Sequence, residues 1–369
     1  MNEYPLLTKK EVKRNRSLKT IQKEYYKNHR GVKGRFLKAR ISKVVKLRRQ
    51  DFFYDFTVSV DAKEKPHKYT RDQLIEAVST MDICGLGGGG FPTGKKLQTL
   101  CQSNATDKYL IINGAECDPG LLHDAWLLQN RLNELEEGIR LLAEVFSFKK
   151  IILAARDALP ASGKDYEVVV VPDRYPMGAE RILIEYLLGI SLDASAIPAK
   201  RGILIMNVQT LHAVYEALYL NRSVTSRFLT VADLTTGEAM VVRAWLGTSI
   251  TELIENIAKK SLKQPVYAGG GILSASKAAP ADTITVKTNF IGFGKEVTYA
   301  QNAKCKGCGV CARKCPMKIK VNKIVQNYEK NNYNFLKFHP ELCIRCGGCT
   351  YHCAAGMNTM ELVSAASSL

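Results

Sequence analysis

The chain has 369 residues, of which 46% are hydrophobic and 24% are charged, and its formal net charge is +18. This length and composition predict two or three globular domains and exclude a disordered chain. No apolar run approaches the roughly 18 residues of a membrane helix, and no secretion signal is evident, so we expect a cytoplasmic protein with reduced thiols.

The positive charge is concentrated at the two ends. Residues 1–50 contain 17 Lys and Arg against three Glu, and residues 301–369 contain ten against three. This asymmetry predicts an acidic partner near one or both ends. For residues 1–50 three interpretations stay open: a solvated basic arm, a docking surface for an acidic protein, and a nucleic-acid-binding tail. Because no nucleic-acid-binding motif accompanies the charge, we expect a protein partner and no nucleic acid.

Taken in chain order, the first regular elements are a strand and a helix. Alternating side chains predict a strand over Phe53–Val60. Leu74, Ile75 and Val78 fall on one face of a helix predicted over Asp72–Met81.

A glycine-rich loop follows this helix directly. Six of the ten residues 85–94 are glycine, and Lys95 and Lys96 come next. Dense glycine lets several backbone N–H groups converge on a phosphate. The dinucleotide fingerprint fails here because a helix precedes the loop, and the P-loop motif fails because Lys96 stands where Ser or Thr is required. A plain structural loop stays open, but the adjacent lysines favour ligand binding.

After the loop the pattern alternates between strands and helices. Such alternation predicts a largely parallel sheet with ligands at the carboxyl ends of its strands. The segment 113–120 and Asn207 follow two of these strands and are candidate site residues. The predicted strands are Tyr109–Asn113, Ile151–Ala154, Val168–Val171 and Ile203–Met206, and the predicted helices are Leu121–Val145, Ala179–Leu188 and Gln209–Leu220.

Residues 226–290 have a different character. A strand at Ala239–Ala244 leads to the capping box Ser249-x-x-Glu252 and to a helix over Ile250–Ala258. This order predicts a small β-grasp module with a structural role. We interpret the glycines of 269–271 as a turn.

Eight of the eleven cysteines fall in two copies of one spacing near the end of the chain. The spacing C-x-x-C-x-x-C-x-x-x-C is that of bacterial [4Fe-4S] runs, in which the fourth cysteine binds the cluster of the other run. Structural zinc does not require a third cysteine at this interval, and disulfides require an oxidising compartment. We therefore assign one cluster to Cys305, Cys308, Cys311 and Cys353, and the other to Cys343, Cys346, Cys349 and Cys315.

From the glycine loop onward the sequence resembles a known family. The loop of residues 85–96 is similar to the flavin-binding loop of the NADH-oxidising flavoprotein subunit of complex I and of the RnfC protein of the Rnf complex. Further segments resemble their motifs in the same order: Asn113-Gly-Ala-Glu116-Cys-Asp118-Pro119, Tyr175-Pro-Met-Gly178-Ala-Glu180 and Asn207-Val-Gln-Thr210. Residues 226–290 resemble the SLBB domain. The chain is thus similar to RnfC-like iron–sulfur flavoproteins over residues 70–369.

The resemblance implies noncovalent FMN, two [4Fe-4S] clusters and NAD(H) as co-substrate. It implies a basic extension over 1–65, an FMN-binding α/β domain over 66–225, an SLBB-like β-grasp domain over 226–290 and a ferredoxin-like domain over 291–369. Glu116 and Glu180 are the implied catalytic residues. The implied cofactor-binding residues are Gly85, Gly87, Gly88, Gly90, Phe91, Lys96, Asn113, Glu116, Asp118, Asn207 and Thr210.

The implied activity is electron transfer from NAD(P)H through FMN and the clusters to a partner redox protein, within a multisubunit complex or a microcompartment. The alternative is an adaptor that relays electrons between proteins without oxidising nicotinamide. Ala115 and Ala179 replace acidic residues of the complex I flavoprotein, so FMN is implied more directly than nicotinamide. The Pro/Gly-rich segment at the start of the RnfC protein has no counterpart here. We therefore expect the soluble relatives, such as microcompartment cobalamin reductase and the proline-reductase-associated electron-transfer protein, to be closer analogues.

Overall fold

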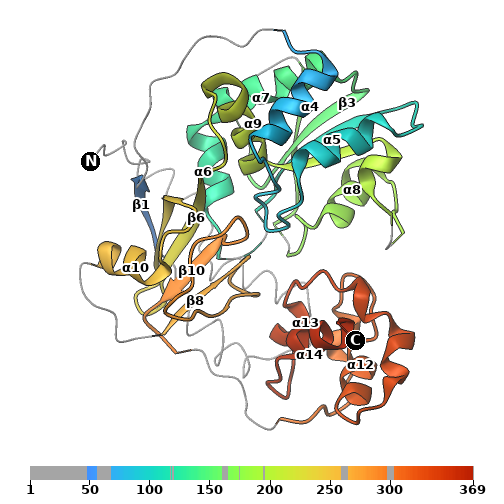
Figure 1. The fold of residues 1–369 in the computed structure, drawn as a ribbon. Helices are drawn as coiled ribbons and strands as arrows, with labels where there is room; N and C mark the ends of the chain where they lie inside the picture. Colours follow the sequence, from blue (N-terminus) through green and yellow to red (C-terminus); the bar gives the residue numbers. More distant parts are fainter. Residues whose placement is uncertain are drawn as a thin grey trace.

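The computed structural model describes residues 48–55, 68–116, 118, 120–159, 165–173, 175–193, 196–258, 265–296 and 303–368, with the backbone alone for 48–55. Figure 1 shows three parts: an α/β domain, a β-sheet with the single helix α10 beside it, and a C-terminal group of short helices. Within these ranges no helix has both the length and the apolarity needed to span a membrane. The predictions made for residues 1–47 lie outside the described residues.

The α/β domain is built on a four-stranded parallel sheet in the order β4-β3-β2-β5. This arrangement confirms the parallel sheet predicted from the alternating pattern. The elements in chain order are α4 (Arg71–Thr80), α5 (Thr93–Cys101), β2 (Tyr109–Gly114), α6 (His123–Asn130), α7 (Leu132–Val145), β3 (Lys150–Ala155), β4 (Glu167–Val170), α8 (Glu180–Leu188), the 3-10 turn η1 (Pro198–Arg201), β5 (Ile203–Asn207) and α9 (Val208–Leu220).

Both faces of this sheet are covered, as the run of apolar residues in each strand requires. Leu110 and Ile112 of β2 point into the larger core, which they share with residues of α4, α5, α6, α7 and α9. Ile111 between them points to the opposite face, where α8 supplies Leu183 and Ile184. All strands run in the same direction, so the carboxyl ends of β2 and β5 meet at one edge.

The single helix predicted over Leu121–Val145 is wrong, because the chain forms α6 and α7 with a break at Arg131. The φ and ψ angles of Arg131 are −132° and 25°, outside the helical region. The Asn130 side chain donates to the Trp126 carbonyl oxygen at 2.8 Å and so satisfies one of the last carbonyl groups of α6. This local hydrogen bond ends the helix where apolar periodicity alone would continue it.

The second sheet has six strands in the order β1-β7-β6-β10-β8-β9. The helix α10 (Ile250–Ala258) packs on one face through Leu253 and Ile254. On the other face Ala232 and Tyr267 pack with Leu121 of the α/β domain. The strands are β1 (Arg48–Asp55), β6 (Ser226–Asp233), β7 (Glu238–Trp245), β8 (Val266–Gly269), β9 (Ser276–Lys277) and β10 (Phe290–Phe293).

Two strands of this sheet come from outside the stretch 226–290. The strand β1 pairs in parallel with β7, and it begins at Arg48 rather than at the predicted Phe53. Residues 56–60 of that prediction lie outside the described residues. At the other end, β10 pairs with β6 in parallel and continues to Phe293. The sheet therefore closes with segments far apart in sequence, while the domain boundaries stay predictions.

The C-terminal part consists of short helices around one small core. Ile324 and Val325 of α12, Phe335 of η2 and Val363 of α14 are buried together with Cys311 and Cys349. Figure 1 shows this part beside both other domains. Its elements are α11 (Val310–Arg313), α12 (Val321–Tyr328), the 3-10 turns η2 (Tyr333–Phe338) and η3 (Pro340–Leu342), α13 (Gly348–Tyr351) and α14 (Thr359–Ser367).

Candidate functional site

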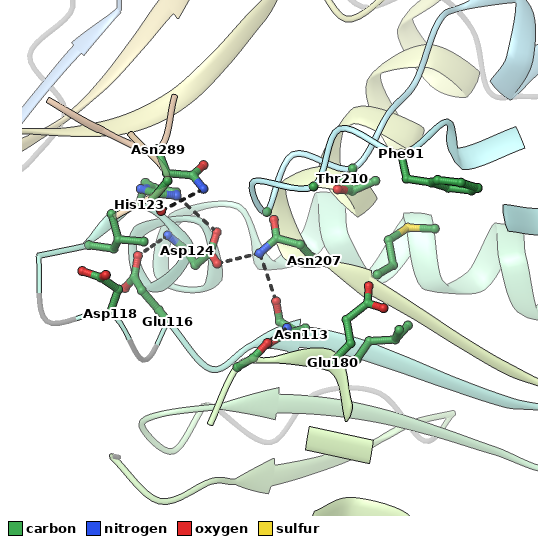
Figure 2. Close-up of a pocket in the computed structure, with 18 of the residues that line it drawn as sticks. Phe91, Asn113, Glu116, Asp118, His123, Asp124, Glu180, Asn207, Thr210 and Asn289 are labelled. Atoms are coloured by element: carbon green, nitrogen blue, oxygen red, sulfur yellow. Dashed lines mark hydrogen bonds and ion pairs between the residues drawn. The ribbon is translucent and has the colours of Figure 1, made fainter. Parts of the chain in front are cut away.

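A cavity of about 250 Å³ lies at the carboxyl ends of β2 and β5, where the glycine loop meets the second sheet. Ten of the predicted site residues line it: Gly85, Gly87, Phe91, Lys96, Asn113, Glu116, Asp118, Glu180, Asn207 and Thr210. Figure 2 shows that these side chains form an elongated arrangement. Glu116 and Asp118 lie at one end, Asn113 and Asn207 in the middle, and Phe91 and Glu180 at the other end.

The glycine loop is a compact, closed turn. The Gly85 N–H donates to the Phe91 carbonyl oxygen at 2.8 Å, and the Gly90 N–H donates to the Gly85 carbonyl oxygen at 2.9 Å. Gly88 and Gly90 are not among the residues that line the cavity, and their φ angles of +104° and +65° are those that glycine adopts without strain. Their contribution is to turn the backbone so that Gly85 and Gly87 face the cavity.

Hydrogen bonds with residues of two domains hold the peptide groups on either side of Leu86 in place. The Leu86 N–H donates to Thr210 Oγ1 at 2.9 Å, and the Leu86 carbonyl oxygen accepts from Arg227 Nη2 at 3.0 Å. Arg227 lies on β6 with 1% of its surface exposed, and it also donates to the carbonyl oxygen of Val286 and to Asn289 Oδ1. Burial lowers the pKa of Arg227 to about 9, so the guanidinium stays charged at neutral pH. The second sheet therefore holds the glycine loop in place.

The start of α9 forms the middle of the cavity wall. Asn207 caps this helix, since its Oδ1 accepts from the Gln209 N–H at 2.9 Å. Its Nδ2 donates to Asp124 Oδ2 at 2.6 Å and to the Asn113 carbonyl oxygen at 3.3 Å (Figure 2). The Asn113 side chain in turn donates to the Gly178 carbonyl oxygen at 2.8 Å. The N-terminal end of a helix carries a partial positive charge that favours an anionic group.

The acidic end of the cavity is buried. Glu116, which has a φ of +34°, accepts from the N–H groups of Asp124 and Ala125 at 2.6 and 3.1 Å and so caps α6. Burial and the neighbouring Glu116 charge raise the pKa of Asp124 well above its usual range. Burial lowers the pKa of His123 to about 3, so this imidazole is neutral. Asp124 therefore binds its proton more tightly than an ordinary aspartate does.

Asp118 joins the cavity to the second sheet. Its Oδ1 accepts from the Gly120 N–H at 2.9 Å and from the Ile272 N–H at 3.1 Å. Burial raises the pKa of Asp118 to about 6, although these N–H groups favour the charged form. Gly271 allows this contact, because a Cβ atom there would lie 2.2 Å from Asp118 Oδ2. The glycines interpreted as a turn therefore also complete the site, and Gly270 lines the cavity.

The other end of the cavity is open to solvent. Lys96 Nζ lies 2.9 Å from Glu180 Oε1 and donates to the Ile205 carbonyl oxygen at 2.9 Å. Phe91 is 52% exposed at the same end. An exposed aromatic ring beside a charged pair can bind a planar ligand that enters from solvent.

Several lining residues escaped the sequence reasoning, above all His123, Asp124, Ser274 and Asn289. His123 and Asp124 lie in the first turn of α6, and the sequence there shows only a predicted helix. Asn289 precedes a strand of the other sheet, and only the tertiary structure brings it to the cavity. The polar character of these residues was visible, but their common location was not.

The cysteines of the first run gather around one small cavity. Cys305, Cys308 and Cys311 line it together with Cys353, the last cysteine of the second run. Burial raises the pKa values of Cys343, Cys346 and Cys349, and the nearby charge of Cys315 adds to the increase for all three. The cavity of the first run thus contains one cysteine of the second run, and Cys315 of the first run lies near enough to affect the thiols of the second. Four thiolates are the donor set that a [4Fe-4S] cluster requires, so these residues fit it.

The main cavity and the second cysteine run are in direct contact. Tyr175, which lines the cavity, donates its hydroxyl proton to the Cys346 carbonyl oxygen at 2.5 Å. Gly347 packs so closely that a Cβ atom there would lie 2.2 Å from the Leu273 carbonyl oxygen. The two candidate sites therefore share a wall.

Two protein-family models match separate parts of the chain. Residues 78–216 match the Nuo51 FMN-binding domain family, and residues 304–357 match the 4Fe-4S dicluster domain family. The RnfC protein of the ion-translocating oxidoreductase complex of Pseudomonas aeruginosa is 32% identical over 260 residues, 67% of this chain and 33% of that relative. Its counterpart in Rhodobacter capsulatus is 28% identical over 268 residues, 69% of this chain and 51% of the relative. The chain spans about half or less of each.

This chain is an RnfC-like iron–sulfur flavoprotein. A crystal structure of NAD+-reducing [NiFe]-hydrogenase in the H2-reduced state shares its fold, with a TM-score of 0.55 and 18% identity over 81% of this chain and 61% of that chain. The RnfC-like chain has an FMN-binding α/β domain and a ferredoxin-like C-terminal domain, and its cofactors are FMN and [4Fe-4S] clusters. The glycine loop that lines its cavity, the positive end of α9 and the grouped thiols fit these cofactors.

Proposed function

We propose that this chain takes electrons from NADH at the flavin site and passes them through two [4Fe-4S] clusters to a partner redox protein or reductase, reversibly. Bound FMN accepts the two electrons of a hydride together and releases them singly, and each cluster takes one. The observation that carries this proposal is the Tyr175 hydrogen bond, because it joins the flavin cavity to a cysteine of the second run at 2.5 Å.

The proposed flavin pocket combines the glycine loop with the start of α9. Gly85 and Gly87 let the flavin approach the backbone, and the positive end of α9 favours its phosphate. Arg227 and Thr210 keep the loop in position through Leu86. The proposed FMN-binding residues are Gly85, Gly87, Gly88, Gly90, Phe91, Lys96, Asn113, Glu116, Asp118, Asn207 and Thr210. Of these, Gly88 and Gly90 act through the turn of the loop, because they do not line the cavity.

The proposed nicotinamide site is the open end of the cavity. Phe91 offers an exposed ring on which a planar base can stack, and Lys96 beside Glu180 orients the entering ligand. We propose Glu116 and Glu180 as the catalytic carboxylates. Both oxygens of Glu116 already accept N–H groups, so we propose that it acts as a fixed negative charge at the buried end of the cavity rather than as a mobile base.

For the clusters, we propose the crossed ligand sets predicted from the spacing: Cys305, Cys308, Cys311 and Cys353 for the first cluster, and Cys343, Cys346, Cys349 and Cys315 for the second. The partner would be an acidic redox protein within a multisubunit complex, since the ferredoxin-like domain is basic. The reduced thiols that clusters require suit a cytoplasmic location. We further propose that 226–290 forms an SLBB-like β-grasp domain between the flavin domain, 66–225, and the ferredoxin-like domain, 291–369.

Anaerobic reduction of the purified protein tests the nicotinamide step. We expect NADH to bleach the flavin and then the iron–sulfur absorbance, with roughly eight irons and one FMN per chain. Dithionite supplies the positive control, and the variant Phe91→Ala should weaken nicotinamide binding while leaving reduction by dithionite unchanged. Rapid reduction by dithionite with none by NADH or NADPH would refute nicotinamide oxidation.

That last outcome would favour the alternative, an adaptor that relays electrons between proteins. One observation supports it: Ala115 and Ala179 stand at positions where the complex I flavoprotein has acidic residues. Under this alternative, a reduced protein donor should bleach the flavin although nicotinamide does not.

A further inference from the structure

We propose that electrons leave the protein from the cluster of the first cysteine run, and that an acidic one-electron redox protein docks on the surface around Cys308. This inference rests on the proposed electron transfer to a protein partner, and it names the exit, the docking surface and the charge of that partner. Three observations carry it: one run is buried against the flavin domain, the other is open to solvent, and positive charge surrounds the open one.

One side of the second run packs against the other domains. Besides the Tyr175 contact to Cys346, the close approach of Gly347 to Leu273 seals this side. Tyr351 of α13 is 7% exposed and packs in one cluster with Leu121 of the flavin domain and residues of the second sheet. A partner protein cannot approach this cluster from the side that faces the flavin, which makes it the entry cluster.

The first run has no such contacts among the described residues. The cavity formed by Cys305, Cys308, Cys311 and Cys353 is lined only by residues of the ferredoxin-like domain. Cys308 is exposed, whereas the other cysteines of the two runs are buried or half-buried. Because electron transfer slows steeply with distance, a partner that covers Cys308 reaches the first cluster by the shortest route.

Positive charge gathers around this exposed cysteine. Lys306 lines the cavity and is exposed, and Lys304 lies two residues before it and is exposed as well. Arg313 of α11 is also exposed, and its Nη1 donates to the Cys308 carbonyl oxygen at 3.1 Å. Between residues 304 and 323 there are seven Lys and Arg and no Asp or Glu. An acidic group, Glu329, also lies near this surface, because its charge adds to the effect of burial in raising the pKa of Cys305.

Such a surface favours an acidic partner over a neutral or basic one. Clustered charge of one sign raises the rate of encounter with a partner of opposite sign, and the effect weakens with ionic strength. A cationic partner would be repelled by the same residues. The chemistry of the docking surface therefore selects an acidic protein that accepts or donates one electron at a time.

A matched pair of charge reversals tests this proposal. Lys306 lies between the first two cysteines of the first run, and Arg345 occupies the corresponding stretch of the second run; both are exposed. The holoprotein is reduced by light and a deazaflavin, independently of nicotinamide, and mixed with an oxidised acidic bacterial ferredoxin in a stopped-flow instrument. Iron content and visible spectra of Lys306→Glu, Lys304→Glu and Arg345→Glu verify that each variant retains its clusters.

We expect Lys306→Glu and Lys304→Glu each to slow ferredoxin reduction about fivefold at low ionic strength, and Arg345→Glu to slow it less than about 1.5-fold. Added salt should remove the difference. Slowing by Arg345→Glu alone would place the exit at the second cluster, and equal rates for all variants would refute the docking surface. If wild-type protein with reduced clusters transfers nothing to the ferredoxin, the proposed transfer to an acidic partner itself fails.

Discussion

The two cysteine runs have the same spacing but different surroundings. At equivalent positions, Gly309 and Gly347 have nearly equal φ angles of +69° and +73°, and each begins a one-turn helix. A Cβ atom on Gly309 would meet the end of the Arg313 side chain at 3.1 Å, whereas one on Gly347 would meet the Leu273 backbone oxygen at 2.2 Å. The shared spacing thus defines the ligand chemistry. Packing distinguishes the second run, which forms a junction with the other domains, from the first run, whose exposed end is the surface around Cys308.

The junction is held by buried polar groups as well as by apolar packing. Arg227, Asp118 and Tyr175 each form hydrogen bonds between segments more than 100 positions apart. The exposed end depends on local contacts, such as that of Arg313 with the nearby Cys308. Changes at the junction should therefore affect stability, flavin retention and internal transfer, whereas changes at the exposed end should affect the partner.

The largest effect is expected for Arg227→Met, which removes a buried charge from the junction. It leaves the carbonyl oxygens of Leu86 and Val286 without their donor, at a cost on the order of 3–5 kcal/mol. We expect a lower thermal midpoint and loss of FMN during gel filtration. Arg243→Met on the neighbouring strand breaks a pair with Glu216 and should retain FMN. Equal flavin retention in both variants would show that Arg227 does not hold the glycine loop.

The next effect is a pH dependence at Asp118. Its pKa is about 6 in the folded protein against an ordinary 3.8, so the folded state binds the proton more tightly. Stability should therefore fall by about 3 kcal/mol as the pH rises between these values, and stay constant above them. Asp118→Asn removes this ionisation, so its thermal midpoint should rise relative to wild type between about pH 4 and about pH 6. Glu341→Gln, at an exposed carboxylate of the ferredoxin-like domain, is the control. Parallel curves for Asp118→Asn and wild type would contradict the prediction.

A matched glycine pair tests the difference in packing directly. Both Gly347→Ala and Gly309→Ala incur the left-handed backbone cost of about 1–2 kcal/mol. Only Gly347→Ala also forces Leu273 to move, which we expect to add about 1–3 kcal/mol. Thermal unfolding of the two holoproteins measures the difference. Equal midpoints would mean that the second run is no more tightly packed than the first.

The smallest effect is expected for Tyr175→Phe, which removes one hydrogen bond across the shared wall. The loss should be about 1 kcal/mol. It should also slow the transfer of electrons from photoreduced flavin to the clusters, because the Cys346 carbonyl oxygen loses its hydrogen bond to the wall of the flavin cavity. Tyr186→Phe, a change at a half-exposed tyrosine of α8, should alter neither quantity. If the two variants transfer at the same rate, the hydroxyl is not part of the connection.

Local sequence patterns predicted much of the fold and part of the site. Most of the helices and strands that apolar periodicity predicted lie within one or two residues of the observed ones, because burial of one face is a local property of the chain. Several others, among them α5, β6 and α12, were not predicted. The glycine loop and the segments near Asn113 and Asn207 were likewise visible, and they line one cavity. The break at Arg131 was not predicted, since it depends on a hydrogen bond of the Asn130 side chain.

The sequence alone determined the chemistry of this protein, because cysteine spacing and glycine density constrain ligands over a few residues. The tertiary structure decided how the parts connect. It brought Asp118 to Ile272 across 154 positions, and Arg227 to Leu86 across 141. It also packed the second cysteine run against the other domains and left Cys308 of the first run exposed. The two runs share one cysteine spacing, so the spacing cannot distinguish entry from exit, whereas packing against the other domains can.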